Sequence, residues 1–330
     1  MNESSASIDK FGFFNTSTSI QQFDLLQSCA RIEKWETMLS DWENFSKTRP
    51  EILKSRIRKG IPSSIRGRVW CLLAEIETLQ QNYPKNYYSH LQTLALDKQV
   101  ESEIKNDLDR TFPNHIKFSQ KTGQLALFRV LRSYAILDPE VSYTQGMSFI
   151  AGMFLLFVDE EQAFWLLLAL LTQNGFRGFF VHGMPKLYSC FYVANGLLRH
   201  YAASVYKKFK KEAISSPMYA TQWFMTGFSS FLNIECTLRI WDCFWNEGFK
   251  VFYRVFLAIM INERKYFCGK SFEKILQRFY ALADEIQGEK LIKAAFRISL
   301  KSKLIQRLEQ DYKKGPKPKY IDWVIVKLNR

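Results

Sequence analysis

The sequence lacks the paired cysteines and clustered histidines from which most zinc sites are built. Its six cysteines and four histidines include no C-x-x-C pair and no H-E-x-x-H motif. We therefore predict no metal site, and reduced thiols in the cytoplasm are the simplest account of the scattered cysteines. The first residues also lack the basic start and apolar run of a secretory signal, and Asn2 predicts no N-myristoylation.

Apolar runs long enough to cross a bilayer are missing as well. The longest, residues 147–171, is interrupted by Asp159-Glu160-Glu161, whereas a transmembrane helix needs about 20 apolar residues. We expect two buried helices with an acidic helix start between them. Sustained alternation of apolar and polar residues is absent too. With 47% hydrophobic residues, the chain is predicted to form an all-α, single large multi-helical domain with no core sheet.

Composition divides the chain into three parts. Residues 1–25 are rich in Ser and Thr and are predicted to be flexible, although their phenylalanines Phe11, Phe13 and Phe14 can dock elsewhere. Residues 26–310 are predicted to form the helical domain. Residues 311–330 form a basic Lys/Pro tail with a short apolar end.

A nucleotide site of the chain's own is not expected. Cys268-Gly269-Lys270-Ser271 resembles the end of a phosphate-binding loop, but Arg264 occupies the position of the earlier glycine. The residues before this motif are predicted to be helical, whereas a phosphate-binding loop follows a strand.

The formal net charge of +14 favours acidic or anionic partners. Much of the excess lies in residues 207–211 and 301–330. Neither segment interleaves aromatic residues in the way of a single-strand-binding surface, so we expect no nucleic acid. Peripheral contact with an anionic membrane through these basic segments, or attraction of an acidic protein, is the better interpretation.

An arginine near the middle of the chain has an unusual setting. Ile104 and Leu108 recur at helical spacing, which places Asp107 and Arg110 one turn apart on a neighbouring face. Pro113 is expected to end this helix near Arg110. The planar guanidinium would then be free to meet phosphate oxygens. The alternative is an ordinary Asp-Arg pair on a solvated helix.

A glutamine follows at the entrance to the long apolar run. Tyr143-Thr144-Gln145-Gly146-Met147 is expected to place Gln145 in the first turn of a buried helix. The amide can accept and donate hydrogen bonds, as positioning a water molecule requires. Gly146 has no side chain to keep another backbone or ligand away. The alternative is a glutamine that caps the helix.

Together these stretches closely resemble the TBC-domain family of Rab GTPase-activating proteins. The motifs I-x-x-D-x-x-R with R-T-F-P, and then Y-x-Q-G-M, are similar to the family's paired signatures. R-x-x-x-W at Arg66 to Trp70 and the stretch from Gln222 to Gly248 also match in order. One departure is Ser142, where the family usually has Gly. If that position needs a positive φ, Ser142 strains the loop.

The resemblance implies a protein that accelerates GTP hydrolysis by a GTP-loaded Rab and regulates vesicle trafficking. It implies an arginine finger at Arg110 and a glutamine finger at Gln145, both acting in trans.

The resemblance also implies supporting roles for other residues. Asp107 braces the arginine, Tyr143 and Gly146 shape the glutamine loop, and Arg66 and Trp70 form a buried supporting pair. GTP and Mg²⁺ belong to the partner, so no cofactor is expected. A cytoplasmic location, peripheral on intracellular membranes, follows. The alternative is a non-catalytic Rab-binding effector or scaffold.

Overall fold

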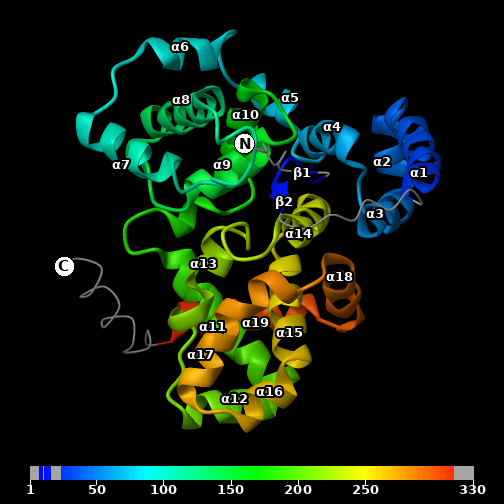
Figure 1. Ribbon diagram of the computed structural model, residues 1–330, viewed down its shortest axis with the longest axis vertical. Coiled ribbons are helices and arrows are strands. Elements are labelled where there is room, and N and C mark those ends of the chain that lie inside the picture. The colour runs from blue at the N-terminus through cyan, green and yellow to red at the C-terminus, as the bar shows by residue number, and fades with distance from the viewer. Residues whose placement is uncertain (1–6, 10, 16–23, 316–330) are drawn as a thin grey trace, which may run out of the picture. The chain divides into compact units, whose positions relative to one another are not determined.

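The computed structural model describes residues 7–9, 11–15 and 24–315 (Figure 1). Contacts within the chain divide it into two compact units, Met1–Ala169 and Leu170–Arg330. The helical domain predicted as one body is thus built from two units. The apolar end of the predicted basic tail lies outside the described residues.

Helices make up the core of the first unit. They are α1 (Asp24–Leu39), α2 (Trp42–Thr48), α3 (Pro50–Lys59), α4 (Ser63–Leu73), α5 (Ile76–Gln80), α6 (Tyr87–Thr93), α7 (Lys98–Leu108), α8 (Lys121–Leu137) and α9 (Met147–Leu155), and α10 (Glu160–Thr172) continues into the second unit. The long apolar run is therefore split into α9 and α10 at its acidic residues, as the sequence predicts.

A short hairpin precedes these helices. Strand β1 (Ser7–Ile8) pairs antiparallel with β2 (Phe14–Asn15). The predicted flexible segment thus contains a hairpin, while the prediction of an all-α domain without a core sheet is confirmed for the part of the chain that the structure describes.

The second unit has an aromatic core. Its elements are η1 (Arg177–Phe179), α11 (Pro185–Tyr201), α12 (Ala203–Lys211), α13 (Pro217–Met225), α14 (Ile234–Glu247), α15 (Lys250–Asn262), α16 (Arg264–Gly269), α17 (Phe272–Glu285), α18 (Gly288–Arg297) and α19 (Ser302–Lys314). Trp223 and Trp241, from the fourth family-like stretch, are buried. The indole N–H of Trp241 donates to the carbonyl of Gly227 at 2.9 Å, so this stretch belongs to the core.

Helix α9 lies at the centre of the first unit, beside α7 and α8 (Figure 1). Every residue of α9 except Phe149 is buried, as expected for a helix that is apolar on all sides. The loop of Gln145 leads directly into this helix. None of the helices in the described ranges combines the length and apolar character of a membrane-spanning segment.

Candidate functional site

Arg110 lies just beyond the C-terminal end of α7. Asp97 begins this helix by accepting two hydrogen bonds from backbone N–H groups of the first turn. Ile104 packs on the inner face and has no exposed surface. The helix ends at Leu108. Arg110 therefore follows a rigid element without being part of it, close to where the sequence predicted the helix to end.

Asp107 is a buried carboxylate with two side-chain partners. Its Oδ1 accepts a hydrogen bond from Nη2 of Arg110, and its Oδ2 accepts one from the hydroxyl of Tyr143. Only 4% of the Asp107 side chain is exposed, compared with 50% of the Arg110 side chain. One carboxylate thus joins the arginine segment to the glutamine loop, while half of the arginine surface stays open to solvent.

Tyr143 remains a hydrogen-bond donor in this arrangement. Burial of the ring raises the pKa of its hydroxyl, and the hydrogen bond to Asp107 raises this pKa further. The phenol therefore stays neutral near physiological pH. Arg110 supplies a positive charge opposite the buried carboxylate, which would otherwise be costly to keep away from water.

The chain turns sharply after Arg110. Thr111 is fully buried, and its hydroxyl donates to the backbone carbonyl of Asp107 at 2.7 Å. Phe112 has a φ of 49°, which lies in the left-handed region. A residue that precedes proline is kept out of the right-handed α region, and Phe112, before Pro113, meets this restriction with a left-handed turn.

Helix α9 packs closely against this turn. A Cβ atom at Gly152 would lie 3.0 Å from Cγ2 of Thr111 and 3.2 Å from Cδ2 of Phe112. The ring of Phe112 also packs edge-on against Phe149, with 5.7 Å between the ring centroids. The missing side chain at Gly152 therefore allows α9 to approach the arginine segment, a contact that the apolar pattern of the sequence does not predict.

The glutamine loop begins with a turn at Asp138. The carbonyl of Asp138 accepts hydrogen bonds from the backbone N–H groups of Val141 and Ser142 at 3.2 and 2.7 Å. Its carboxylate accepts one from the hydroxyl of Tyr134 at 2.9 Å. Ser142 has a φ of 54°. The position where the family usually has Gly is therefore left-handed, at a cost of about 1–2 kcal/mol for a residue with a Cβ atom.

Gln145 lies before helix α9, so its predicted place in the first helical turn was wrong. The helix begins at Met147, and Gly146 is the N-cap residue with a φ of 102°. This left-handed glycine delays the start of the helix beyond the point that the apolar pattern indicated. Gln145 is exposed, and its amide makes no hydrogen bond with the residues described by the structure.

Arg66 and Trp70 lie in α4 and pack at the opposite end of α9. Arg66 is 4% exposed and donates to the carbonyl of Ile61 at 2.6 Å. Its guanidinium lies 5.1 Å from the ring centroid of Phe157. Trp70 is fully buried, edge-on against Phe154 and Phe157. These residues thus contact the C-terminal end of the helix whose N-terminal end carries the Gln145 loop.

Comparison with known proteins identifies the family. A model of the Rab-GTPase-TBC domain matches residues 63–268, more than half of the chain. The chain belongs to the Rab-GTPase-TBC domain family. The matched region of this TBC protein includes every candidate residue from Arg66 to Gly146. The N-terminal hairpin lies outside it.

Relatives of this TBC protein include longer proteins. The human Ecotropic viral integration site 5 protein homolog is 31% identical over 283 residues, which are 84% of this chain and 34% of that protein. Rab GTPase-activating protein tbc-11 of Caenorhabditis elegans is 31% identical over 293 residues, which are 86% of this chain and 31% of that protein. The chain therefore spans about a third of the length of these relatives.

A solved structure agrees with the TBC fold. The crystal structure of the Chlamydomonas flagellar RabGAP TBC domain matches with a TM-score of 0.71 and 27% sequence identity. The match covers 88% of this chain and 99% of that domain. The helical architecture therefore agrees with that of a solved TBC domain over most of the chain.

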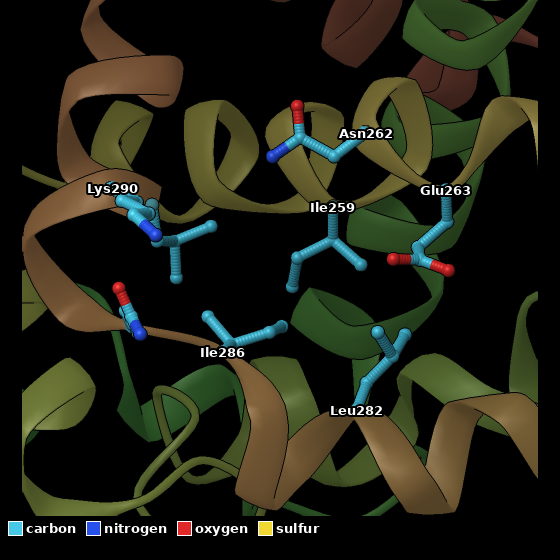
Figure 2. A pocket seen from close by; sticks show the side chains of 8 residues that line it. Ile259, Asn262, Glu263, Leu282, Ile286 and Lys290 are labelled. Carbon is cyan, nitrogen blue, oxygen red and sulfur yellow. The ribbon is translucent and has the colours of Figure 1, made fainter.

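The second unit of this TBC protein contains a hollow of about 110 Å³, which is separate from the residues around Arg110 and Gln145 (Figure 2). Four of the eight residues that line it are aliphatic, including Ile259, Leu282 and Ile286, and the other four are polar or charged. Glu263 at its edge is paired with Arg278 at 2.8 Å. The hollow is smaller than the roughly 300–1,000 Å³ of typical ligand sites. Among residues 7–9, 11–15 and 24–315, no cluster of His, Cys, Asp and Glu is arranged to hold a metal ion.

Proposed function

We propose that this TBC protein accelerates GTP hydrolysis by a Rab-family GTPase, with Arg110 and Gln145 entering the partner's active site. One observation carries the proposal. The buried carboxylate of Asp107 joins Arg110 to the loop of Gln145 through Tyr143, while Arg110 and Gln145 themselves reach solvent. Membership of the Rab-GTPase-TBC family supports the choice of partner.

Arg110 would act on the charge that develops on the transferred phosphoryl group. A small GTPase alone is slow because this charge is incompletely neutralised, and an inserted arginine is worth about 10³–10⁵ in rate. Asp107 engages one guanidinium nitrogen, Nη2. This contact orients the planar group before the partner arrives, so less conformational entropy is lost on docking.

Gln145 would position the attacking water in place of the GTPase's own glutamine. A primary amide can accept a hydrogen bond from water and donate one to a phosphate oxygen. Its side chain is exposed, so we attribute its positioning to the backbone. The turn at Asp138 and the left-handed Gly146 fix the loop on both sides of it.

GTP and Mg²⁺ would be supplied by the partner in this reaction. The chain would contribute the side chains of Arg110 and Gln145, and we expect it to need no cofactor of its own. The sequence Cys268-Gly269-Lys270-Ser271 does not argue for a nucleotide site, because its first two residues are the end of helix α16, whereas a phosphate-binding loop follows a strand.

The basic residues of α12 suggest where the protein meets a membrane. Lys207, Lys210 and Lys211 are exposed, whereas Val205 and Phe209 on the same helix are buried. Each lysine near an anionic surface contributes about 1 kcal/mol of attraction. A cytoplasmic protein that contacts intracellular membranes peripherally, and that acts in vesicle trafficking, fits this distribution better than one that binds nucleic acid.

The proposal is tested by GTP hydrolysis across a panel of purified Rabs, each with and without this protein, under single-turnover conditions. We expect at least one Rab to be accelerated by about 10³-fold or more. Tight binding of GTP-loaded Rabs without acceleration would instead identify a non-catalytic effector. If no Rab is bound and none is accelerated, both interpretations are overturned.

A further inference from the structure

The N-terminal hairpin docks on the segment that follows Arg110. The backbone N–H of Phe14 donates to the carbonyl of Asn114 at 3.0 Å, and the N–H of Ile116 donates to the carbonyl of Gly12 at 2.9 Å. These two bonds form an antiparallel bridge between segments about 100 residues apart in the chain. Pairing of this kind needs both backbones in register, so the contact is specific.

His115 adds a side-chain link to the hairpin. Its ring is buried, with Nδ1 accepting a hydrogen bond from the N–H of Lys117 at 3.0 Å. The proton must therefore lie on Nε2, which donates to the carbonyl of Phe11 at 2.8 Å. The neutral imidazole thus uses both nitrogens, one toward its own loop and one toward the hairpin.

Phe13 connects the hairpin to the turn after Arg110. Its ring lies edge-on to His115 and to Phe112, with 4.8 and 6.1 Å between ring centroids. Phe112 in turn packs against Phe149 of α9. The left-handed turn is thereby held between the hairpin and α9, only two residues from Arg110.

Gly12 allows the hairpin to approach this closely. It has a φ of 93°, and a Cβ atom there would lie 2.6 Å from Nε2 of His115. Both the backbone conformation and the space therefore require a residue without a side chain. The hairpin and the imidazole of His115 are thus in close contact at Gly12.

We propose that the hairpin is a positioning element for Arg110. By restraining residues 111–118, it raises the fraction of molecules in which the guanidinium is oriented for the partner. The hairpin does not occlude the arginine, since half of the Arg110 side chain is exposed while the hairpin is docked. This inference rests on the proposed function. It adds Phe13 and His115 as positioning residues, because both contact the segment that follows Arg110.

The test compares Phe13→Ala with Phe14→Ala in the full chain. Phe14 lies next to Phe13 but is 40% exposed, so it is the matched control. A displacement of a catalytic group by 1 Å can lower a rate about 100-fold. We expect the loosened segment in Phe13→Ala to displace Arg110 by less than this, and the maximal single-turnover rate to fall about tenfold. The Rab concentration for half-maximal rate should change little. Amide hydrogen exchange over residues 111–118 should become faster in Phe13→Ala and stay at the wild-type rate in Phe14→Ala.

Two substitutions of His115 separate the hairpin link from the loop itself. Asparagine can replace Nδ1 as acceptor but cannot reach Phe11, whereas glutamine can place its amide N–H near the position of Nε2. His115→Asn should therefore resemble Phe13→Ala, and His115→Gln should recover part of the rate. Thermal midpoints of all four variants establish that the fold is retained.

Unchanged or increased hydrolysis in Phe13→Ala, with faster exchange, would overturn the positioning role. Unchanged exchange would show that the hairpin does not restrain the segment and would overturn the proposal as well. If the wild type accelerates no Rab, the proposed function fails. The exchange measurement still decides whether the hairpin holds residues 111–118.

Discussion

At the scale of single residues, the proposed reaction depends most on the shape of the Arg110 side chain. Its guanidinium is planar and carries five donors, so it can contact a carboxylate and phosphoryl oxygens at the same time. Asp107 already occupies one nitrogen of this group. A cation without that planar geometry could not serve both partners.

Arg110→Lys should therefore lose most of the activity although its charge is kept. We expect the single-turnover rate to fall by about 100-fold or more, a substantial part of what an arginine finger contributes. Affinity for the GTP-loaded Rab, measured by titration, should change much less. Arg68→Lys is the control, because Arg68 is exposed and forms only a surface ion pair. Full activity in Arg110→Lys would refute the finger assignment.

Ser142 provides a test of backbone strain in the glutamine loop. Its φ of 54° favours glycine. Relief of about 1–2 kcal/mol of strain exceeds the roughly 0.4–1 kcal/mol that glycine costs through the unfolded chain. Ser142→Gly should thus raise the thermal midpoint, whereas Ser142→Ala, which keeps a Cβ atom, should not. A lower midpoint for the glycine variant would show that the serine side chain stabilises the loop.

At the scale of elements, helix α9 connects the parts of the site. Gly152 contacts the arginine segment, the Gln145 loop enters the helix at Met147, and Trp70 packs against Phe154. A disturbance at one end of this buried helix is therefore expected to reach both functional side chains.

Trp70→Ala should act through the fold. Removing a fully buried tryptophan costs roughly 3–5 kcal/mol, so the thermal midpoint and the hydrolysis rate should fall together. Trp42 is only partly buried, and Trp42→Ala should have a smaller effect on both. Lost activity at an unchanged midpoint would instead place Trp70 within the functional site.

The sequence predicts best those features that depend on neighbours along the chain. The acidic break before α10 and the end of α7 near Arg110 follow from local composition and from Pro113. The start of α9 was misplaced because Gly146 adopts a left-handed backbone that no apolar pattern reveals. The hairpin contact with His115 escaped prediction because its two segments lie about 100 residues apart.

At the scale of the whole molecule, we propose that two proteins complete one active site. The chain would supply Arg110 and Gln145, and the GTPase would supply GTP, Mg²⁺ and the attacking water. The net charge of +14 would favour encounter with acidic or membrane-bound partners. In this proposed reaction, Gln145 replaces the partner's own glutamine in orienting the water.

The most direct measurement uses a Rab whose switch glutamine is replaced by alanine, because a larger leucine could block docking by its bulk alone. Single-turnover GTP hydrolysis is followed for this Rab with the wild-type protein and, separately, for the wild-type Rab with Gln145→Ala. We expect the alanine Rab to remain substantially responsive and Gln145→Ala to be nearly inactive. An unresponsive alanine Rab together with a fully active Gln145→Ala would contradict the second finger and leave only Arg110.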